Sequence, residues 1–183
     1  MTTPTNIYLI GPMGSGKSAV GRRLARLLGL SFRDNDDEVE QRTGVDIPLI
    51  FEKEGEAGFR RREAAVLADL VTERGVVLAT GGGTPMHPES RRLLAAGGAV
   101  VYLYTSVAEQ LRRTSRTRHR PLLEVDDPRA RLEQLFAERD PVYRKTADLV
   151  VETDGRHVNT VARDIARRLE SLDDPAAGHE ATK

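Results

Sequence analysis

A glycine-rich segment near the start of the chain narrows the folds available to it. The segment Gly11–Ser18 reads GPMGSGKS and matches the pattern G-x-x-x-x-G-K-[ST] at every fixed position. The apolar run Ile7–Ile10 precedes it and is typical of a buried strand, and Ser18–Leu28 follows it with apolar residues at helical spacing. A strand, a glycine-rich turn and a helix in this order predict a phosphate-binding P-loop.

The P-loop predicts how a nucleoside triphosphate is held. Glycines allow backbone N–H groups to curl around phosphate oxygens, and the helix N-terminus faces the anion. Lys17 is expected to reach the β- and γ-phosphates and the Ser18 hydroxyl to bind Mg²⁺. The ordinary alternative is a chance glycine turn, which the flanking strand and amphipathic helix argue against. The predicted nucleotide-binding residues of the loop are Gly14, Ser15, Gly16, Lys17, Ser18 and Ala19.

The rest of the chain alternates short apolar runs with longer segments of helical periodicity. The predicted strands are Ile7–Ile10, Leu30–Arg33, Val76–Thr80, Ala99–Tyr104 and Leu149–Glu152. The predicted helices are Ser18–Leu28, Asp37–Arg42, Ile47–Glu54, Glu56–Arg74, Pro88–Ala96, Val107–Arg113, Pro128–Thr146 and Val158–Leu172. This order predicts an α/β fold, a three-layer sandwich with a five-stranded parallel sheet covered on both faces. Ligands then bind beyond the carboxyl ends of the strands.

Length and composition limit the domain count and the partners. With 183 residues, the chain suits one domain over 1–172, followed by a polar tail, 173–183, that is expected to be disordered. The 28 basic and 28 acidic residues balance, which argues against nucleic acid or an anionic membrane as partner. The absence of cysteine, of a signal peptide and of a long apolar stretch favours a cytoplasmic location. No feature suggests assembly, so we expect a monomer.

Polar clusters follow three of the predicted strands. The P-loop follows the first strand, Asp34 and Asp36 end the second, and Gly81–Gly83 follows the third. If the second strand continues through the aspartates, alternation places both carboxylates on one face. One can then support Mg²⁺ and the other can orient or deprotonate an acceptor hydroxyl. The alternative is a solvated acidic helix cap.

Two arginine-rich segments are further candidates. Arg60, in a run of three arginines, lies three residues before Glu63 on a predicted helix, so Glu63 can hold it in position, while the other arginines of the run can be solvated. The segment of about 115–125 carries several arginines before Pro121 and is predicted to be a mobile lid that closes over the phosphates. The chain has no N-K-x-D motif, which argues against a GTPase.

Together these segments resemble the shikimate kinases, within the nucleoside-monophosphate-kinase-like group of P-loop proteins. The resemblance runs from about Ile7 to Leu169, and its motifs occur in the family's order and spacing. The motifs are the P-loop, Asp34-x-Asp36, Glu40-Gln41-x-Thr43-Gly44, Phe59-Arg60-Arg61-x-Glu63, Gly81-Gly82-Gly83, Arg118-x-Arg120-Pro121-Leu122-Leu123 and Arg139-x-x-x-Tyr143. The resemblance implies a P-loop kinase fold and transfer of the γ-phosphate of ATP to the 3-hydroxyl of shikimate.

The resemblance also implies roles for individual residues. Asp36 would bind the substrate hydroxyls as base or positioner, and Asp34 would hold the Mg²⁺ hydration shell beside Ser18. Arg60 and Arg139 would clamp the shikimate carboxylate. The remaining acceptor-site residues are Phe59, Glu63, Gly81, Gly82 and Gly83, with the Gly82 backbone against a ring hydroxyl. Lys17 and Arg120 would act on the transferring phosphoryl group, and Arg113 and Arg156 would contact the nucleotide.

Two departures and two alternatives accompany this interpretation. The chain has Asn35 where the family often has Ser or Thr, and Ala19 where Thr is common. Asn35 is expected to point away from the site if the strand interpretation holds. A related kinase for another polyol acid or a nucleoside monophosphate is the first alternative; with only eight aromatic residues, the chain offers little to stack a second base. A nucleotide-binding regulatory module without catalysis is the second.

Overall fold

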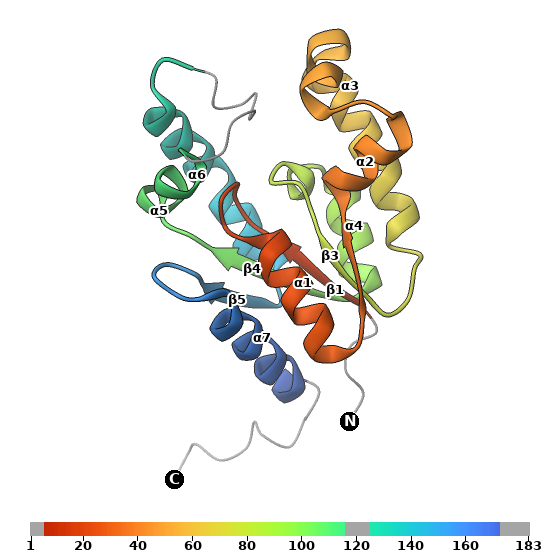
Figure 1. Cartoon of the computed structure of the whole chain (residues 1–183), viewed down its shortest axis with the longest axis vertical. Helices are drawn as coiled ribbons and strands as arrows, with labels where there is room; N and C mark the ends of the chain where they lie inside the picture. The colour runs from red at the N-terminus through yellow and green to blue at the C-terminus, as the bar shows by residue number, and fades with distance from the viewer. Residues whose placement is uncertain (1–5, 116–124, 173–183) are drawn as a thin grey trace.

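The fold is a parallel sheet between two layers of helices (Figure 1). A computed structural model describes residues 6–115 and 125–172 of the protein. The strands are β1 (Asn6–Ile10), β2 (Ser31–Asp34), β3 (Val76–Ala79), β4 (Ala99–Tyr104) and β5 (Leu149–Glu152), and they lie in the order β2-β3-β1-β4-β5. All four pairings are parallel, as in Ile7 opposite Val77 and Ile7 opposite Ala99. The five-stranded parallel sheet predicted from the sequence is therefore confirmed.

Alternate residues of the strands face two separate hydrophobic layers. Ile7 and Leu9 pack with helices α1 (Lys17–Leu28) and α7 (Val158–Leu172). Tyr8 and Ile10 face the opposite layer. That layer comprises α2 (Asn35–Thr43), α3 (Ile47–Leu70), α4 (Pro88–Gly97) and α6 (Pro128–Thr146). Both faces of each central strand are thus buried, which explains why these strands are continuous apolar runs.

The remaining elements lie at the carboxyl edge of the sheet. The short 3₁₀ helix η1 (Thr84–Met86) follows β3, and α5 (Val107–Thr114) follows β4. Figure 1 shows α2 and α3 on one side of the P-loop and α5 and α6 on the other. Within the described ranges, each helix is either too short or too polar to cross a membrane.

Helix α3 is bent at a glycine. Gly55 has φ 69° and ψ −178°, which breaks the helix between Ile47–Glu54 and the part that begins at Glu56, as the sequence predicts. The second part ends at Leu70 and not at Arg74, so the predicted end was wrong. The last residues form a turn instead, in which the Thr72 hydroxyl and N–H both donate to the Asp69 carbonyl.

Candidate active site

The P-loop holds its lysine against the loop backbone. Gly14 and Gly16 have positive φ angles of 77° and 88°, as a loop that turns its N–H groups inward requires. The Lys17 Nζ donates hydrogen bonds to the Gly11 and Pro12 carbonyls, both at 2.8 Å. Ala19 lies in the first turn of α1 and is exposed. An incoming phosphate would exchange with these carbonyls as the partner of Lys17.

Asp34 connects the end of β2 to the P-loop. Its Oδ2 accepts a hydrogen bond from the Ser18 hydroxyl at 2.5 Å, and its Oδ1 accepts one from the Asp36 N–H at 3.1 Å. The described residues contain no cluster of three or more His, Cys, Asp or Glu side chains suited to a metal. One hydroxyl and one carboxylate beside a phosphate loop nevertheless fit Mg²⁺, which takes few protein ligands and completes its shell with water and phosphate oxygens.

Asp36 reaches the site from a helix, contrary to the strand alternation expected from the sequence. Strand β2 ends at Asp34, which caps α2, and Asp36 lies in the first turn of that helix. Asp34 is therefore a helix cap, as the alternative interpretation predicts. Asp36, in contrast, is not a solvated residue of the helix start. Its Oδ1 is buried and has no hydrogen-bond partner among the described residues. Asn35 is also buried, and its amide donates to the Glu63 carbonyl at 3.4 Å.

The surroundings of Asp36 disfavour its charge. Burial raises the pKa of Asp36 to about 7, and the neighbouring Glu63 and Asp34 carboxylates add to the rise, while Lys17 and Arg60 oppose it. A carboxyl with a pKa near neutrality and a partnerless oxygen is suited to accept a proton from a bound hydroxyl.

Arg60 is fixed on the acceptor side by a chain of polar contacts. Its Nη1 lies 2.8 Å from Glu63 Oε2, as the i,i+3 spacing predicts, and its Nη2 lies 3.1 Å from Glu56 Oε1. Glu63 is 1% exposed and also accepts a hydrogen bond from the Thr84 hydroxyl at 2.8 Å. A Cβ on Gly83 would lie 2.5 Å from the Arg60 guanidinium, so only glycine allows this approach. Arg61 and Arg62 are exposed, as expected for part of this run.

Arg139 is a buried cation of a different kind. It is 9% exposed and has no carboxylate partner among the described residues, although its guanidinium interacts with the Tyr143 phenol. Tyr143 donates to the Gly82 carbonyl, and burial raises the pKa of Tyr143 to about 12, which keeps the phenol protonated. A buried arginine without a carboxylate is the arrangement expected where a ligand supplies the anion.

These groups line one cleft beside the P-loop. The cleft has a volume of about 130 Å³, and Phe51 and Phe59 line it with ring centroids 5.0 Å apart and ring planes tilted by 36°. Its lining residues are Met13, Asp36, Ile47, Phe51, Phe59, Arg60, Glu63, Gly81, Gly82, Gly83 and Arg139. The structure thus brings together every acceptor-site residue predicted from the sequence. Met13 and Ile47 were not predicted, because an apolar side chain in a loop or at a helix start carries no chemical signal.

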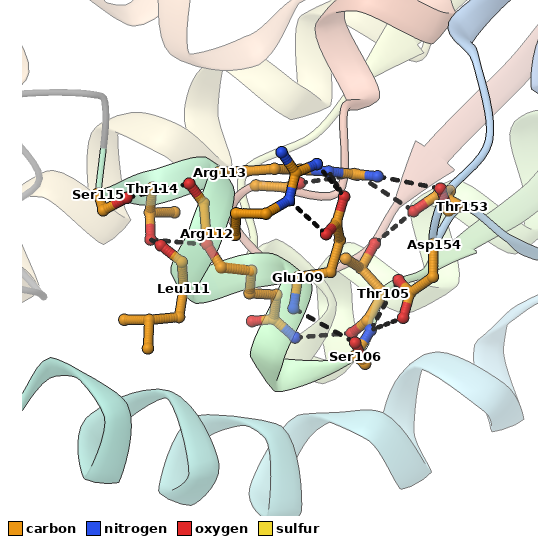
Figure 2. A network of polar contacts seen from close by, with 12 residues as sticks. Thr105, Ser106, Glu109, Leu111, Arg112, Arg113, Thr114, Ser115, Thr153 and Asp154 are labelled. Carbon is orange, nitrogen blue, oxygen red and sulfur yellow. Dashed lines mark hydrogen bonds and ion pairs between the residues drawn. The ribbon is translucent and has the colours of Figure 1, made fainter.

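A second pocket adjoins the other side of the P-loop. Arg113 lies in it and donates to Glu109 at 2.7 Å, to the Gly14 carbonyl at 3.1 Å and to the Thr153 carbonyl at 3.0 Å. Figure 2 shows Arg113 extending from α5 past Glu109 toward Thr153, just after β5. Arg156 lines the same pocket and donates to Asp164 at 3.0 Å. Both predicted nucleotide-contacting arginines therefore lie beside the P-loop.

Part of the prediction falls on residues that are not described. Arg120 and most of the predicted lid lie within 116–124, and the predicted tail is 173–183; both ranges lie outside the described residues. Thr84 is a site residue that sequence reasoning missed, although it directly follows the triple glycine. Tyr143 belongs to a quoted motif, but its hydrogen bond to Gly82 depends on how α6 packs against the loop after β3.

A P-loop at the end of a central parallel strand, facing a cleft with a buried carboxyl and two arginines, defines a P-loop kinase that acts on a small molecule. The sequence profile of the shikimate kinase family matches residues 13–170. The chain therefore belongs to the shikimate kinase family. It is 60% identical to the shikimate kinase of Thioalkalivibrio sulfidiphilus over 91% of this chain and 88% of that protein, and 60% identical to that of Halorhodospira halophila over 92% and 95%.

Solved structures agree with this assignment. The shikimate kinase of Acinetobacter baumannii, solved in complex with shikimate, is 49% identical to this chain and superposes with a TM-score of 0.91. The superposition covers 92% of this chain and 94% of that one. A gluconokinase from Sinorhizobium meliloti has a TM-score of 0.60 at 19% identity, which indicates the P-loop kinase fold alone.

Proposed function

We propose that the protein transfers the γ-phosphate of ATP to the 3-hydroxyl of shikimate, giving shikimate 3-phosphate and ADP, a step toward chorismate and the aromatic amino acids. The observation that carries the proposal is the complementary pair in the cleft. Among the residues that the structure describes, the buried Arg139 has no carboxylate partner and the buried Asp36 Oδ1 has no hydrogen-bond donor. A ligand with a carboxylate at one end and hydroxyls at the other satisfies both groups.

The acceptor roles follow from this pairing. Arg60 and Arg139 bind the carboxylate, with Glu63 holding Arg60 from behind. Asp36 accepts the hydrogen bond of the reacting hydroxyl and takes its proton at Oδ1 as the phosphoryl group departs from ATP. The backbone of Gly81–Gly83 and the Phe59 ring complete the wall against which the ring of the acceptor lies.

The nucleotide roles fall on the opposite side of the P-loop. The N–H groups of Gly14–Ser18 and the Lys17 ammonium bind the β- and γ-phosphates, and Arg113 and Arg156 line the space for the nucleoside. Ser18 and Asp34 hold Mg²⁺ directly or through water; when bound, the ion neutralises phosphate charge that develops during transfer. Arg120 is assigned to the transferring phosphoryl group on the family motif.

Little covalent chemistry is left to the protein in such a transfer. Most of the rate enhancement comes from holding the acceptor oxygen in line with the γ-phosphorus and from placing positive charge around it. The cleft and the P-loop meet at Met13, which lines the cleft and lies within Gly11–Ser18. We further infer that 1–172 is one domain and that the protein acts as a monomer in the cytoplasm.

An ADP-release assay with purified protein, Mg-ATP and shikimate tests the proposal, and NMR of the product identifies the phosphorylated oxygen. Among shikimate, gluconate and nucleoside monophosphates, we expect turnover only with shikimate. The methyl ester of shikimate, which keeps the hydroxyls and loses the carboxylate, should react with a KM raised about a hundredfold, because each charge-assisted contact is worth about 1.5–3 kcal/mol. Gluconate and nucleoside monophosphates form the rest of the panel. ADP release no faster than with ATP alone would refute the proposal.

A further inference from the structure

A second groove lies behind the acceptor cleft, where α3 packs beside α4. Its apolar lining is formed by Ala57, Ala64, Ala68, Met86 and Leu93. Arg60, Gly83 and Arg139 line both this groove and the acceptor cleft. These three residues therefore form a wall that the groove and the acceptor cleft share. None of the roles proposed above uses the groove side of this wall.

The charges that line the groove are unbalanced. Glu56 is ion-paired with Arg60, and Glu89 is ion-paired with Arg92, so both carboxylates of the groove already have cationic partners. Arg61 and Arg139 line the groove without an ion-pair partner among the described residues. A groove with two unpaired cations and no unpaired carboxylate favours an anionic ligand.

A largely buried serine in the same groove points independently to a ligand. Ser90 is only 3% exposed, lines the groove and makes no side-chain hydrogen bond within 6–115 or 125–172. It lies in the first turn of α4, and no side chain caps the N-terminus of that helix. The Ser90 hydroxyl and the uncapped N–H groups beside it therefore offer the groove donors for which the described residues supply no acceptor.

We propose that this groove binds a small carboxylate with an apolar body. The carboxylate accepts hydrogen bonds from the Ser90 hydroxyl and the first turn of α4, with Arg61 and Arg139 supplying positive charge. The apolar body covers the three alanines of α3. Because the ligand shares Arg60 and Arg139 with the acceptor cleft, its binding weakens that of an anionic acceptor, and by reciprocity the acceptor weakens the binding of the groove ligand.

Direct binding tests the groove without any need for turnover. Benzoate is titrated into the nucleotide-free protein by calorimetry, with benzamide as the neutral isostere and acetate as the anion without an apolar body. We expect saturable benzoate binding and at least tenfold weaker binding of the other two. Ser90→Ala should weaken benzoate binding about tenfold, the effect of a hydrogen bond to a charged group. Arg61→Gln should weaken it about threefold, since this cation is exposed.

Arg163→Gln is the matched control, because Arg163 is an exposed arginine of α7, across the sheet, and has no ion pair among the described residues. It should leave benzoate affinity unchanged. If Arg61→Gln and Ser90→Ala both retain wild-type affinity, or if benzoate does not bind at all, the proposal is wrong. The exposed Arg61 keeps the test decisive should Ser90→Ala fail to fold.

The coupling to the acceptor rests on the proposed function and has its own readout. Saturating benzoate should raise the KM for shikimate about fivefold to a plateau with kcat unchanged, and Arg61→Gln should shift the benzoate concentration that is needed. Unlimited competitive inhibition that neither groove variant alters would place benzoate in the acceptor cleft and overturn the proposal. Failure of shikimate turnover alone would refute the proposed function and leave the binding result intact.

Discussion

The acceptor cleft and the nucleotide side of the P-loop treat their charges differently. In the cleft, Arg60 is held by Glu63, and Glu63 in turn accepts a hydrogen bond from the Thr84 hydroxyl. On the nucleotide side, Lys17 donates to two carbonyls of its own loop, and Ser18 donates to Asp34. These contacts must be exchanged when phosphate and metal arrive.

This difference indicates that selectivity lies in the acceptor cleft and adaptability on the nucleotide side of the P-loop. A preorganised arginine binds a carboxylate in one fixed geometry and loses little conformational entropy on binding. Such an arginine is suited to discriminate among acceptors. The Lys17 ammonium, in contrast, donates to backbone carbonyls that stabilise its charge. A phosphate can replace these carbonyls as hydrogen-bond acceptor. Four experiments address this contrast.

Asp36→Asn tests the reactive end of the rigid cleft. The amide retains the shape of the side chain and cannot accept a proton, so kcat should fall about a thousandfold, within the range for loss of a general base. ATP affinity, measured by titration without acceptor, should stay near that of the wild type because Asp36 lies on the acceptor side. Turnover within a few-fold of the wild type would remove Asp36 from the mechanism.

The same variant tests, through its pH dependence, how much the ionised Asp36 carboxylate destabilises the folded protein. The folded-state pKa of Asp36 is about 7 against an ordinary value of 3.8, so the folded state releases this proton later than the unfolded state. Asp36 therefore contributes nothing unfavourable below about pH 4, destabilises increasingly up to about pH 7 and stays unfavourable above it. Asp36→Asn removes this cost, which amounts to as much as about 4 kcal/mol.

The destabilisation caused by ionised Asp36 is measured by urea unfolding of both proteins at pH 5 and pH 8, without nucleotide and with a chelator present. The charges facing Asp36 are Asp34, Glu63, Lys17 and Arg60, and all are present in both proteins. The advantage of Asp36→Asn should therefore be larger at pH 8. An equal advantage at both values, or a larger one at pH 5, would contradict the burial of an ionised carboxylate.

Arg60→Met and Arg139→Met compare the two arginines of the cleft. Arg60→Met leaves Glu63 buried without its cation and should cost about 3 kcal/mol in the free energy of unfolding. Arg139→Met breaks no ion pair and should cost less than about 1 kcal/mol, although both variants should raise the KM for shikimate. The double variant Arg60→Met/Glu63→Gln is the control. It should recover most of the free energy of unfolding that Arg60→Met loses. Equal losses in the two single variants would show that the distinction is false.

Ser18→Ala tests the exchangeable side. Loss of one partly exposed hydrogen bond to Asp34 should cost only about 1 kcal/mol in the free energy of unfolding. The Mg²⁺ concentration for half-maximal turnover should rise at least tenfold, because the hydroxyl is a proposed metal ligand. Stability loss as large as that of Arg60→Met would mean that the nucleotide side is as rigidly built as the cleft.

Much of the fold could be predicted because hydrophobic periodicity and glycine position act locally. The helix Pro128–Thr146 and the strand Leu149–Glu152 have the predicted bounds, and the break in α3 falls at Gly55. The start of α2 was misplaced because a chain can pass from strand to helix within one residue when a carboxylate caps the helix. Strand alternation therefore predicted correctly that Asp34 and Asp36 lie close together, although Asp36 lies on a helix and not on the strand.

The site was predictable as a set of residues more than as a set of contacts. Arg60 and Glu63 are near neighbours on one helix, so sequence spacing alone indicates their pair. Thr84 with Glu63 and Tyr143 with Gly82 join residues 21 and 61 positions apart, which only tertiary packing brings together. That Arg139 has no carboxylate partner among the described residues is equally invisible in a sequence, because it depends on which acidic groups the fold brings near it.

The order of the strands has a consequence for how the protein acquires its structure. β1 is central and comes first in the chain, yet its partners are β3 and β4, so that Ile7 must wait for Ala99, 92 positions later. Even the most local ladder joins Ser31 to Val76, 45 positions apart. Because no hairpin can nucleate such a sheet, loop closure must precede every pairing, which is typical of slow folding. During synthesis, the first functional motif to leave the ribosome is therefore held in its working geometry only after more than half of the chain has followed it.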